Sequence, residues 1–210
     1  MMNNCSNIIM TDNLKQYDLT PLAKACRKAA SFDLFKCSSG NMSWRIDDSH
    51  MAVTATRSWL GELTAEQVAL CRLIDGETLN KVKPTVEARF HLGILRCRPE
   101  MNVVLHFQSR YATAVACGDS SSYNFNVIPE IPYYIGKIGI VPFLPPGSPE
   151  LAEAVIEQMK THNLAVMRNH GLVTVAENFN MAIQNAVFFE LACSVLLTQP
   201  NPVYIDDSWV

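Results

Sequence analysis

Four polar segments lie inside otherwise apolar or tightly turning sequence and carry the residue types that bind metals or anions. They are SSGN (38–41), PTVEARFH (84–91), HFQ (106–108) and RNHG (168–171). Imidazole and carboxylate groups are common ligands of divalent metals, and consecutive backbone N–H groups in a glycine-containing turn can hold an anion. Each segment also has an ordinary structural interpretation, as a turn, a helix start or a hydrogen-bonded histidine.

The run VVLHFQS (103–109) is typical of a β-strand, in which alternate side chains point to opposite faces of the sheet. One face would carry the apolar residues at 103, 105 and 107. The other would carry Val104, His106 and Gln108. Two polar groups that point the same way indicate either a metal site or a strand that is half exposed to solvent.

Glu87 and His91 are four residues apart and would share one face of a helix. Alone, this pair indicates a carboxylate favoured in the first helical turn and a surface histidine. His170 lies between two apolar runs, and Gly171 would let that strand end approach another strand closely. A single histidine is more often structural than a ligand, and no local metal motif such as HExxH occurs. Two histidines from separate strands with a carboxylate available favour a metal site more than each does alone.

The periodicity of apolar residues predicts helices that alternate with strands. Helices are expected at 13–36, 64–71, 85–98, 111–117, 149–160 and 179–198, and strands at 42–46, 51–56, 102–108, 131–135, 140–143, 164–167 and 172–175. Ser109 and Ser148 are expected to be helix N-caps, the second followed by Pro149 in the first turn. This alternation predicts one α/β domain over residues 1–210, with a core at about 20–198 and loose tails.

The composition is that of a globular protein, with 49% hydrophobic and 18% charged residues in a chain of 210. The net charge is −3 without a Lys/Arg cluster, so nucleic acid is not an expected partner. No signal peptide is expected, and the most apolar segment, 186–197, is too short to span a membrane and contains Glu190. Seven cysteines without a CxxC pair indicate a cytoplasmic protein with reduced thiols.

Together the four segments resemble motifs of the class II aldolase/adducin family. The family pattern SGNxS matches residues 39–43, and its P-S-S-E…H pattern matches 84–91. The run RPEMNVVLHFQSRYATAVA (98–116) is similar to the family segment that contains HxH, and RNHGLVTV (168–175) to its NHG strand pair. The order and spacing of all four agree across about residues 20–198.

The resemblance implies a three-layer α/β domain, with a central and mainly antiparallel sheet flanked by helices. It also implies a homotetramer with active sites between subunits, and a zinc ion held by the positions of His106, Gln108, His170 and Glu87. The positions that would bind the phosphate of a sugar phosphate are Gly40, Asn41, Thr56 and Thr85. Tyr133 would reach the site from the neighbouring subunit.

Among the members, L-fuculose-1-phosphate aldolase looks similar, and Glu87 stands where related pentulose-phosphate epimerases carry Asp. The implied reaction cleaves a ketose 1-phosphate to dihydroxyacetone phosphate and an aldehyde through an enediolate. Glu87, with a pKa raised by partial desolvation, would shuttle a proton to the enediolate carbon. Tyr133 would protonate the departing alkoxide.

Four positions depart from the family pattern. Gln108 replaces a zinc histidine, Val86 a phosphate-contacting serine, and Arg57 a frequent glycine, while Tyr204 is the nearest candidate for a C-terminal tyrosine. A site with Gln108 would bind zinc less tightly and tolerate manganese or cobalt. Arg57 would either add charge to the phosphate site or block it. Two other functions stay open: a non-catalytic, adducin-like role in assembly or regulation, and an epimerase or dehydratase on the same scaffold.

Overall fold

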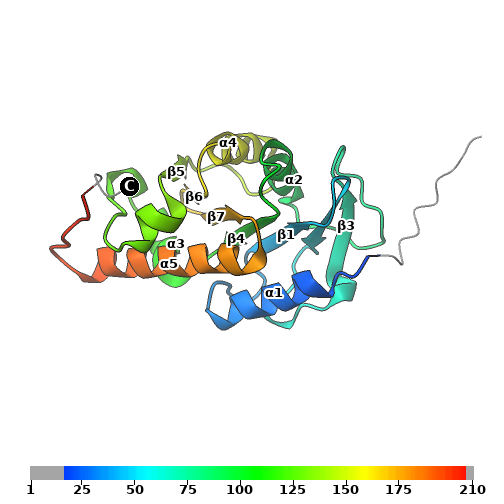
Figure 1. Cartoon of the computed structure of the whole chain (residues 1–210), viewed down its shortest axis with the longest axis horizontal. Coiled ribbons are helices and arrows are strands. Elements are labelled where there is room, and N and C mark those ends of the chain that lie inside the picture. The colour runs from blue at the N-terminus through cyan, green and yellow to red at the C-terminus, as the bar shows by residue number, and fades with distance from the viewer. Residues whose placement is uncertain (1–16, 207–210) are drawn as a thin grey trace, which may run out of the picture.

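A computed structural model describes residues 17–206 of the chain (Figure 1). The strands are β1 (Asn41–Arg45), β2 (His50–Thr54), β3 (Val68–Arg72), β4 (Val103–Phe107), β5 (Ile138–Val141), β6 (Leu164–Met167) and β7 (Gly171–Ala176). The α-helices are α1 (Thr20–Ser31), α2 (Ala88–Cys97), α3 (Arg110–Ala116), α4 (Pro149–Met159) and α5 (Phe179–Thr198). Short 3-10 helices cover Leu60–Glu62, Ala65–Gln67 and Ser120–Ser122, and a π-helical turn covers Ile131–Ile135.

The seven strands form one sheet in the order β3-β2-β1-β4-β7-β6-β5. Neighbouring strands are antiparallel except β5 and β6, which are parallel. The predicted α/β fold with a mainly antiparallel sheet is therefore confirmed. The residues predicted to form the N-terminal tail and the last part of the C-terminal tail, 1–16 and 207–210, lie outside the described residues.

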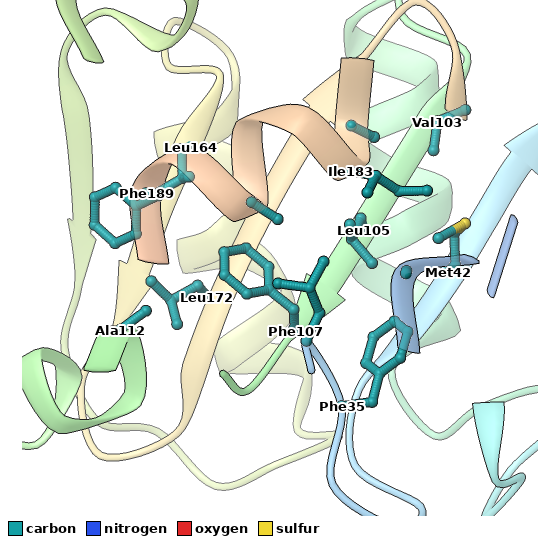
Figure 2. Packing of buried hydrophobic residues seen from close by; sticks show 14 of the residues in the cluster. Phe35, Met42, Val103, Leu105, Phe107, Ala112, Leu164, Leu172, Ile183 and Phe189 are labelled. Atoms are coloured by element: carbon teal, nitrogen blue, oxygen red, sulfur yellow. The ribbon is translucent and has the colours of Figure 1, made fainter. Parts of the chain in front are cut away.

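Two apolar cores cover the two faces of the sheet. Helices α1, α3 and α5 pack on one face, and α2 and α4 pack on the other (Figure 1). Leu105 and Phe107 of β4 point into the first core beside Ile183 of α5 (Figure 2). Val104 belongs to the second core with Phe90 of α2. The predicted alternation along β4 is confirmed, and it directs the intervening His106 toward α2.

Glu190 in the middle of α5 fixes the end of β4. Its carboxylate accepts hydrogen bonds from the Ser109 hydroxyl (2.6 Å) and from the backbone N–H groups of Tyr111 (2.9 Å) and Ala112 (2.7 Å). Ser109 is the N-cap residue of α3 as predicted, but the capping acceptor is Glu190 rather than the serine itself. By length and composition alone α5 could cross a membrane; here its buried residues, such as Ile183, pack against the sheet.

Two expected elements are wrong. The predicted helix at 64–71 is a single 3-10 turn, closed by a capping box between Thr64 and Gln67, and then strand β3. The apolar side chains of β3 are buried by pairing with β2, which outweighs a short helical pattern. The predicted strand at 131–135 is a π-helical turn with Pro132 at its start. Ser148 caps α4 as predicted, accepting the N–H of Leu151 at 3.1 Å.

Candidate metal centre

Three of the predicted ligands converge on one buried point. Glu87 lies at the N-terminus of α2, His106 on β4, and His170 in the turn between β6 and β7. Glu87 Oε2 is 3.5 Å from His106 Nε2, and Glu87 Oε1 is 3.2 Å from His170 Nε2. One ligand atom from each residue lies within 4.8 Å of the others, so the three side chains could hold a metal ion.

The protonation of His106 makes its Nε2 atom a free electron-pair donor. Its Nδ1 atom lies 2.8 Å from the backbone carbonyl of Leu172, an acceptor, so Nδ1 carries the proton. Burial lowers the pKa of His106, and the Glu87 carboxylate opposes this shift only in part. The neutral ring therefore points an Nε2 lone pair at a carboxylate oxygen. Two acceptors that face each other call for a cation between them, and a backbone carbonyl behind the ring is the usual support of a metal-binding histidine.

Glu87 is ionised in this arrangement. Burial by itself raises the pKa of Glu87, but His106 whenever it is protonated, together with the nearby His170 and the Asn41 amide, holds it well below its usual value. The expectation of a raised pKa is therefore wrong, because these polar neighbours outweigh desolvation. An ionised carboxylate here could serve as a metal ligand or as a proton acceptor.

Two buried polar atoms of the cluster have no hydrogen-bond partner among residues 17–206. They are Oε1 of Glu87 and Nδ1 of His170. A buried carboxylate oxygen without a donor is costly unless a ligand satisfies it. Together with the facing lone pair of His106, this oxygen fits a divalent ion held by nitrogen and oxygen donors.

Gln108 lies beside the cluster and contacts His170 through the backbone. Its amide nitrogen donates to the His170 carbonyl oxygen at 2.7 Å. Gly171 makes this approach possible, because a Cβ atom there would lie 2.8 Å from Gln108 Cγ and 3.0 Å from His106 Cε1. The structure thus places Gln108 against the histidine turn, while its role as a ligand stays a prediction.

The residues expected to bind phosphate lie near the N-terminal end of α2. Asn41 donates from its amide to Glu87 Oε2 (2.8 Å) and to the Thr85 hydroxyl (3.2 Å), so its side chain serves the carboxylate. The N–H of Thr56 donates to the Lys83 carbonyl at 3.1 Å, which brings Thr56 next to this segment. Gly40 has φ +75°, and a Cβ atom there would lie 2.7 Å from the His106 carbonyl oxygen.

Arg57 occupies a backbone conformation that favours glycine. Its φ is +60°, and its side chain is exposed beside a cavity of about 420 Å³ that Trp59 and Gln67 also line. Val86, the other departure near the phosphate positions, is 60% exposed. The positive φ at position 57 thus explains why a glycine, which the family often carries there, would fit without strain.

The two tyrosines expected from the family pattern lie elsewhere in the subunit. Tyr133 is 81% exposed on the π-helical turn, where its ring packs edge-on against Tyr134. Within residues 17–206, Tyr133 makes no contact with the metal cluster. Tyr204 is 46% exposed, and the N–H of the adjacent Ile205 donates to the Asn126 carbonyl.

His91 is the site residue that the sequence placed wrongly. It was expected on the surface, yet it is fully buried, and its ring nitrogens contact Asn41 and Ser43. Helix α2 packs this face against β1 and β4, so the side chains of Glu87 and His91 point into the protein. The two-residue spacing of Asn41 and Ser43 on β1, which directs both side chains to that face, is the sequence signal that could have revealed it.

Comparison with known proteins found one family model and several relatives. Residues 20–197 match the family described as Class II Aldolase and Adducin N-terminal domain. The chain is 34% identical over 163 residues to a 3-oxo-tetronate 4-phosphate decarboxylase of Haemophilus influenzae, covering 76% of this chain and 77% of that protein. It is 35% identical over 176 residues to an L-fuculose phosphate aldolase of Methanococcus maripaludis, covering 83% and 94%.

Solved structures share the fold. The crystal structure of YgbL from Escherichia coli, titled a putative aldolase/epimerase/decarboxylase, has a TM-score of 0.82 and 25% identity, and the match covers 89% of this chain and 92% of that chain. An L-fuculose 1-phosphate aldolase has a TM-score of 0.77 at 22% identity, with 90% of each chain covered.

The His170→Ala variant is expected to lose stoichiometric metal, because two remaining ligands are too few for tight binding. The metal content of protein purified without chelator measures this. His162→Ala is the control, since His162 contacts the Gln158 carbonyl at the opposite end of β6. Unchanged metal content in His170→Ala would show that the cluster is not the metal site.

The Gln108→His variant is expected to bind zinc more tightly, by about tenfold or more (~1.4 kcal/mol), because imidazole is the better zinc donor. Competition with a chromophoric chelator gives the affinity, and Gln158→His on α4 is the control. Equal zinc affinity in Gln108→His and the parent would argue against position 108 as a ligand position.

Proposed function

We propose, because this chain belongs to the class II aldolase and adducin family, that it is a metal-dependent lyase that releases dihydroxyacetone phosphate from a phosphorylated sugar. A ketose 1-phosphate such as L-fuculose 1-phosphate is the first candidate substrate. The observation that carries the proposal is the ionised Glu87 carboxylate facing the neutral His106 at 3.5 Å, with His170 beside it.

Cleavage of a ketose 1-phosphate beside its carbonyl leaves an electron pair on the dihydroxyacetone phosphate half, as an enediolate. Glu87, His106 and His170, with Gln108 as a fourth candidate, would hold zinc or another divalent ion such as manganese or cobalt. When bound, that ion would supply Lewis-acid stabilisation of the negative oxygen. The chain's own residues then have to bind the phosphate and move two protons.

Glu87 is the residue placed to move the proton at carbon. Asn41 holds its Oε2 atom, whereas Oε1 is free of hydrogen bonds from residues 17–206. The free oxygen can take a proton from dihydroxyacetone phosphate in the direction of aldol addition and return it in cleavage. The low pKa of Glu87 keeps its carboxylate ionised, so the carboxylate can accept the proton in the direction of aldol addition.

Thr85 is the clearest phosphate donor. Its hydroxyl oxygen already accepts the Asn41 amide (3.2 Å) and the N–H of Glu87 (3.3 Å), so its own proton is available to a phosphate oxygen. Gly40 and Thr56 flank it and would add donors. Arg57, exposed on the neighbouring segment, would add a positive charge.

Tyr133 would complete the site from a neighbouring subunit of a homotetramer. Its 81% exposure suits a residue that a second subunit covers. A cavity of about 730 Å³ lies between residues 120–126 and β5 and is not lined by Glu87, His106 or His170. In cleavage, Tyr133 would accept the proton that the C4 hydroxyl loses as it becomes the aldehyde carbonyl, and in aldol addition it would return that proton to the alkoxide.

Decarboxylation is the second candidate, favoured by the 34% identity to a 3-oxo-tetronate 4-phosphate decarboxylase. Loss of CO₂ from such a 3-oxo acid leaves its bonding pair on carbon. The product is the same enediolate, which one proton converts to dihydroxyacetone phosphate. This reaction uses Glu87 and the phosphate residues, but it converts no hydroxyl to an aldehyde, so it does not need Tyr133.

Release of dihydroxyacetone phosphate tests the proposal. The metal-loaded protein is assayed with L-fuculose 1-phosphate and with 3-oxo-tetronate 4-phosphate, and the product is followed by enzymatic reduction with NADH. Tyr133→Phe should slow aldol cleavage and leave decarboxylation near the parent rate. Stoichiometric metal with no product from either substrate would overturn the proposal and favour the adducin-like or epimerase interpretation.

Arg57→Gly is expected to weaken phosphate binding and to stabilise the fold. Loss of a charged hydrogen bond of ~1.5 kcal/mol or more should weaken the binding of inorganic phosphate about tenfold. Relief of the positive φ should raise the free energy of unfolding by about 1 kcal/mol. Calorimetric titration and urea denaturation measure the two effects.

Asp33→Gly is the matched control for Arg57→Gly, because Asp33 also has φ +60° but lies in the turn after α1. It should change stability without changing phosphate affinity. If Arg57→Gly binds phosphate as tightly as the parent, Arg57 has no part in the anion site.

A further inference from the structure

His91 is a buried titratable group to which the proposed chemistry gives no task. It lies on α2 four residues after Glu87, and its side chain is fully buried. Its ring stacks on Phe90, with ring centroids 4.6 Å apart and planes at 22°. Packing alone could explain an aromatic ring here, but both ring nitrogens also have polar partners.

The chemistry of the neighbours fixes the direction of each hydrogen bond. The Glu87 carboxylate only accepts, so the NH₂ group of Asn41 must face it, as it does at 2.8 Å. The Asn41 carbonyl oxygen therefore faces His91 Nε2, which must carry the proton. The His91 Nδ1 atom is then an acceptor, and the Ser43 hydroxyl donates to it at 2.7 Å.

We infer that His91 is a positioning residue, which acts through Asn41 to hold the Glu87 carboxylate with Oε2 bound and Oε1 free. The inference rests on the proposed role of Glu87. The chain of donors runs from Ser43 through His91 and Asn41 to Glu87, and every link in it is at least 90% buried. With the opposite tautomer, the Nε2 lone pair of His91 would face the Asn41 carbonyl oxygen. Asn41 would then lose the hydrogen bond that holds its NH₂ group toward Glu87.

Burial also keeps the relay in one state. Removal from water lowers the pKa of His91 to about 3, against a smaller opposite effect of the Glu87 charge. The ring is therefore neutral at physiological pH and has a single proton to place. Buried polar networks are stabilising when every member has its hydrogen-bond partners. Ser43, His91, Asn41 and Glu87 therefore behave as a unit.

A pair of substitutions separates positioning from packing. His91→Gln keeps a donor toward Asn41, whereas His91→Leu fills a similar volume without one. We expect His91→Leu to weaken metal binding by ~10–100-fold, the usual effect of losing support behind a ligand, and to lower kcat more than it changes KM. His91→Gln should recover most of both losses, and the same pair at His162 should have no effect.

Equal losses in the two variants, in step with their melting temperatures, would show that His91 only packs. Full metal affinity in His91→Leu would also overturn the inference. If His91→Leu does not fold, Ser43→Ala is the milder variant: it removes the donor to Nδ1, and metal affinity should fall by ~10-fold. Unchanged affinity in Ser43→Ala would count against the relay.

The tautomer is measured without metal or substrate. Two-bond ¹H–¹⁵N correlation spectra of ¹⁵N-histidine protein, assigned with His91→Gln, should show His91 as the neutral Nε2–H form. An Nδ1–H form would overturn the inference. Because this readout and metal affinity do not depend on turnover, a protein that releases no dihydroxyacetone phosphate would overturn the proposed function and leave the positioning result standing.

Discussion

The structure is organised around two electron-pair donors that face each other in a buried part of the subunit. The Nε2 lone pair of His106 and the ionised carboxylate of Glu87 lie 3.5 Å apart, and the free oxygen of the same carboxylate lies 3.2 Å from His170. Such an arrangement favours a cation between the two groups, and the three residues could hold a metal ion. The surrounding contacts each fix one member: the Leu172 carbonyl orients His106, and Asn41 orients Glu87.

The fold supplies these groups from distant parts of the chain. Strand β4 lies between β1 and β7, so His106 is directly opposite Asn41 on one side and Val173 on the other. The first turn of α2 then brings Glu87 onto this surface. Gly171 lets the turn between β6 and β7 lie close to β4, since a side chain at position 171 would clash with His106 and Gln108. The sheet thus carries His106, and the start of α2 and the turn between β6 and β7 bring Glu87 and His170 against it.

The sequence predicted the sheet, and the cluster of Glu87, His106 and His170, better than it predicted the surroundings of that cluster. The alternation along β4 separated its core face from the face of His106, since the period of two depends only on local geometry. His91 was assigned to the surface because helical spacing shows which residues share a face and not which way that face looks. The direction of that face depends on the packing of α2 over β1, a tertiary contact. Strand β3 was missed for the same reason, because pairing with β2 determines its conformation. The lowered pKa of Glu87 required the positions of three neighbours from separate elements.

Glu190 has a consequence beyond the cap that it provides for α3. During synthesis, α5 is a 20-residue apolar segment of a kind that lipid can accept. A charged side chain near the centre of such a segment raises its free energy of membrane insertion by ~2.5–3.5 kcal/mol. While the chain is unfolded, Glu190 therefore opposes partition of α5 into a bilayer. After folding, the same carboxylate accepts three hydrogen bonds at the end of β4. Glu190 therefore disfavours membrane insertion of the unfolded chain and stabilises the folded one.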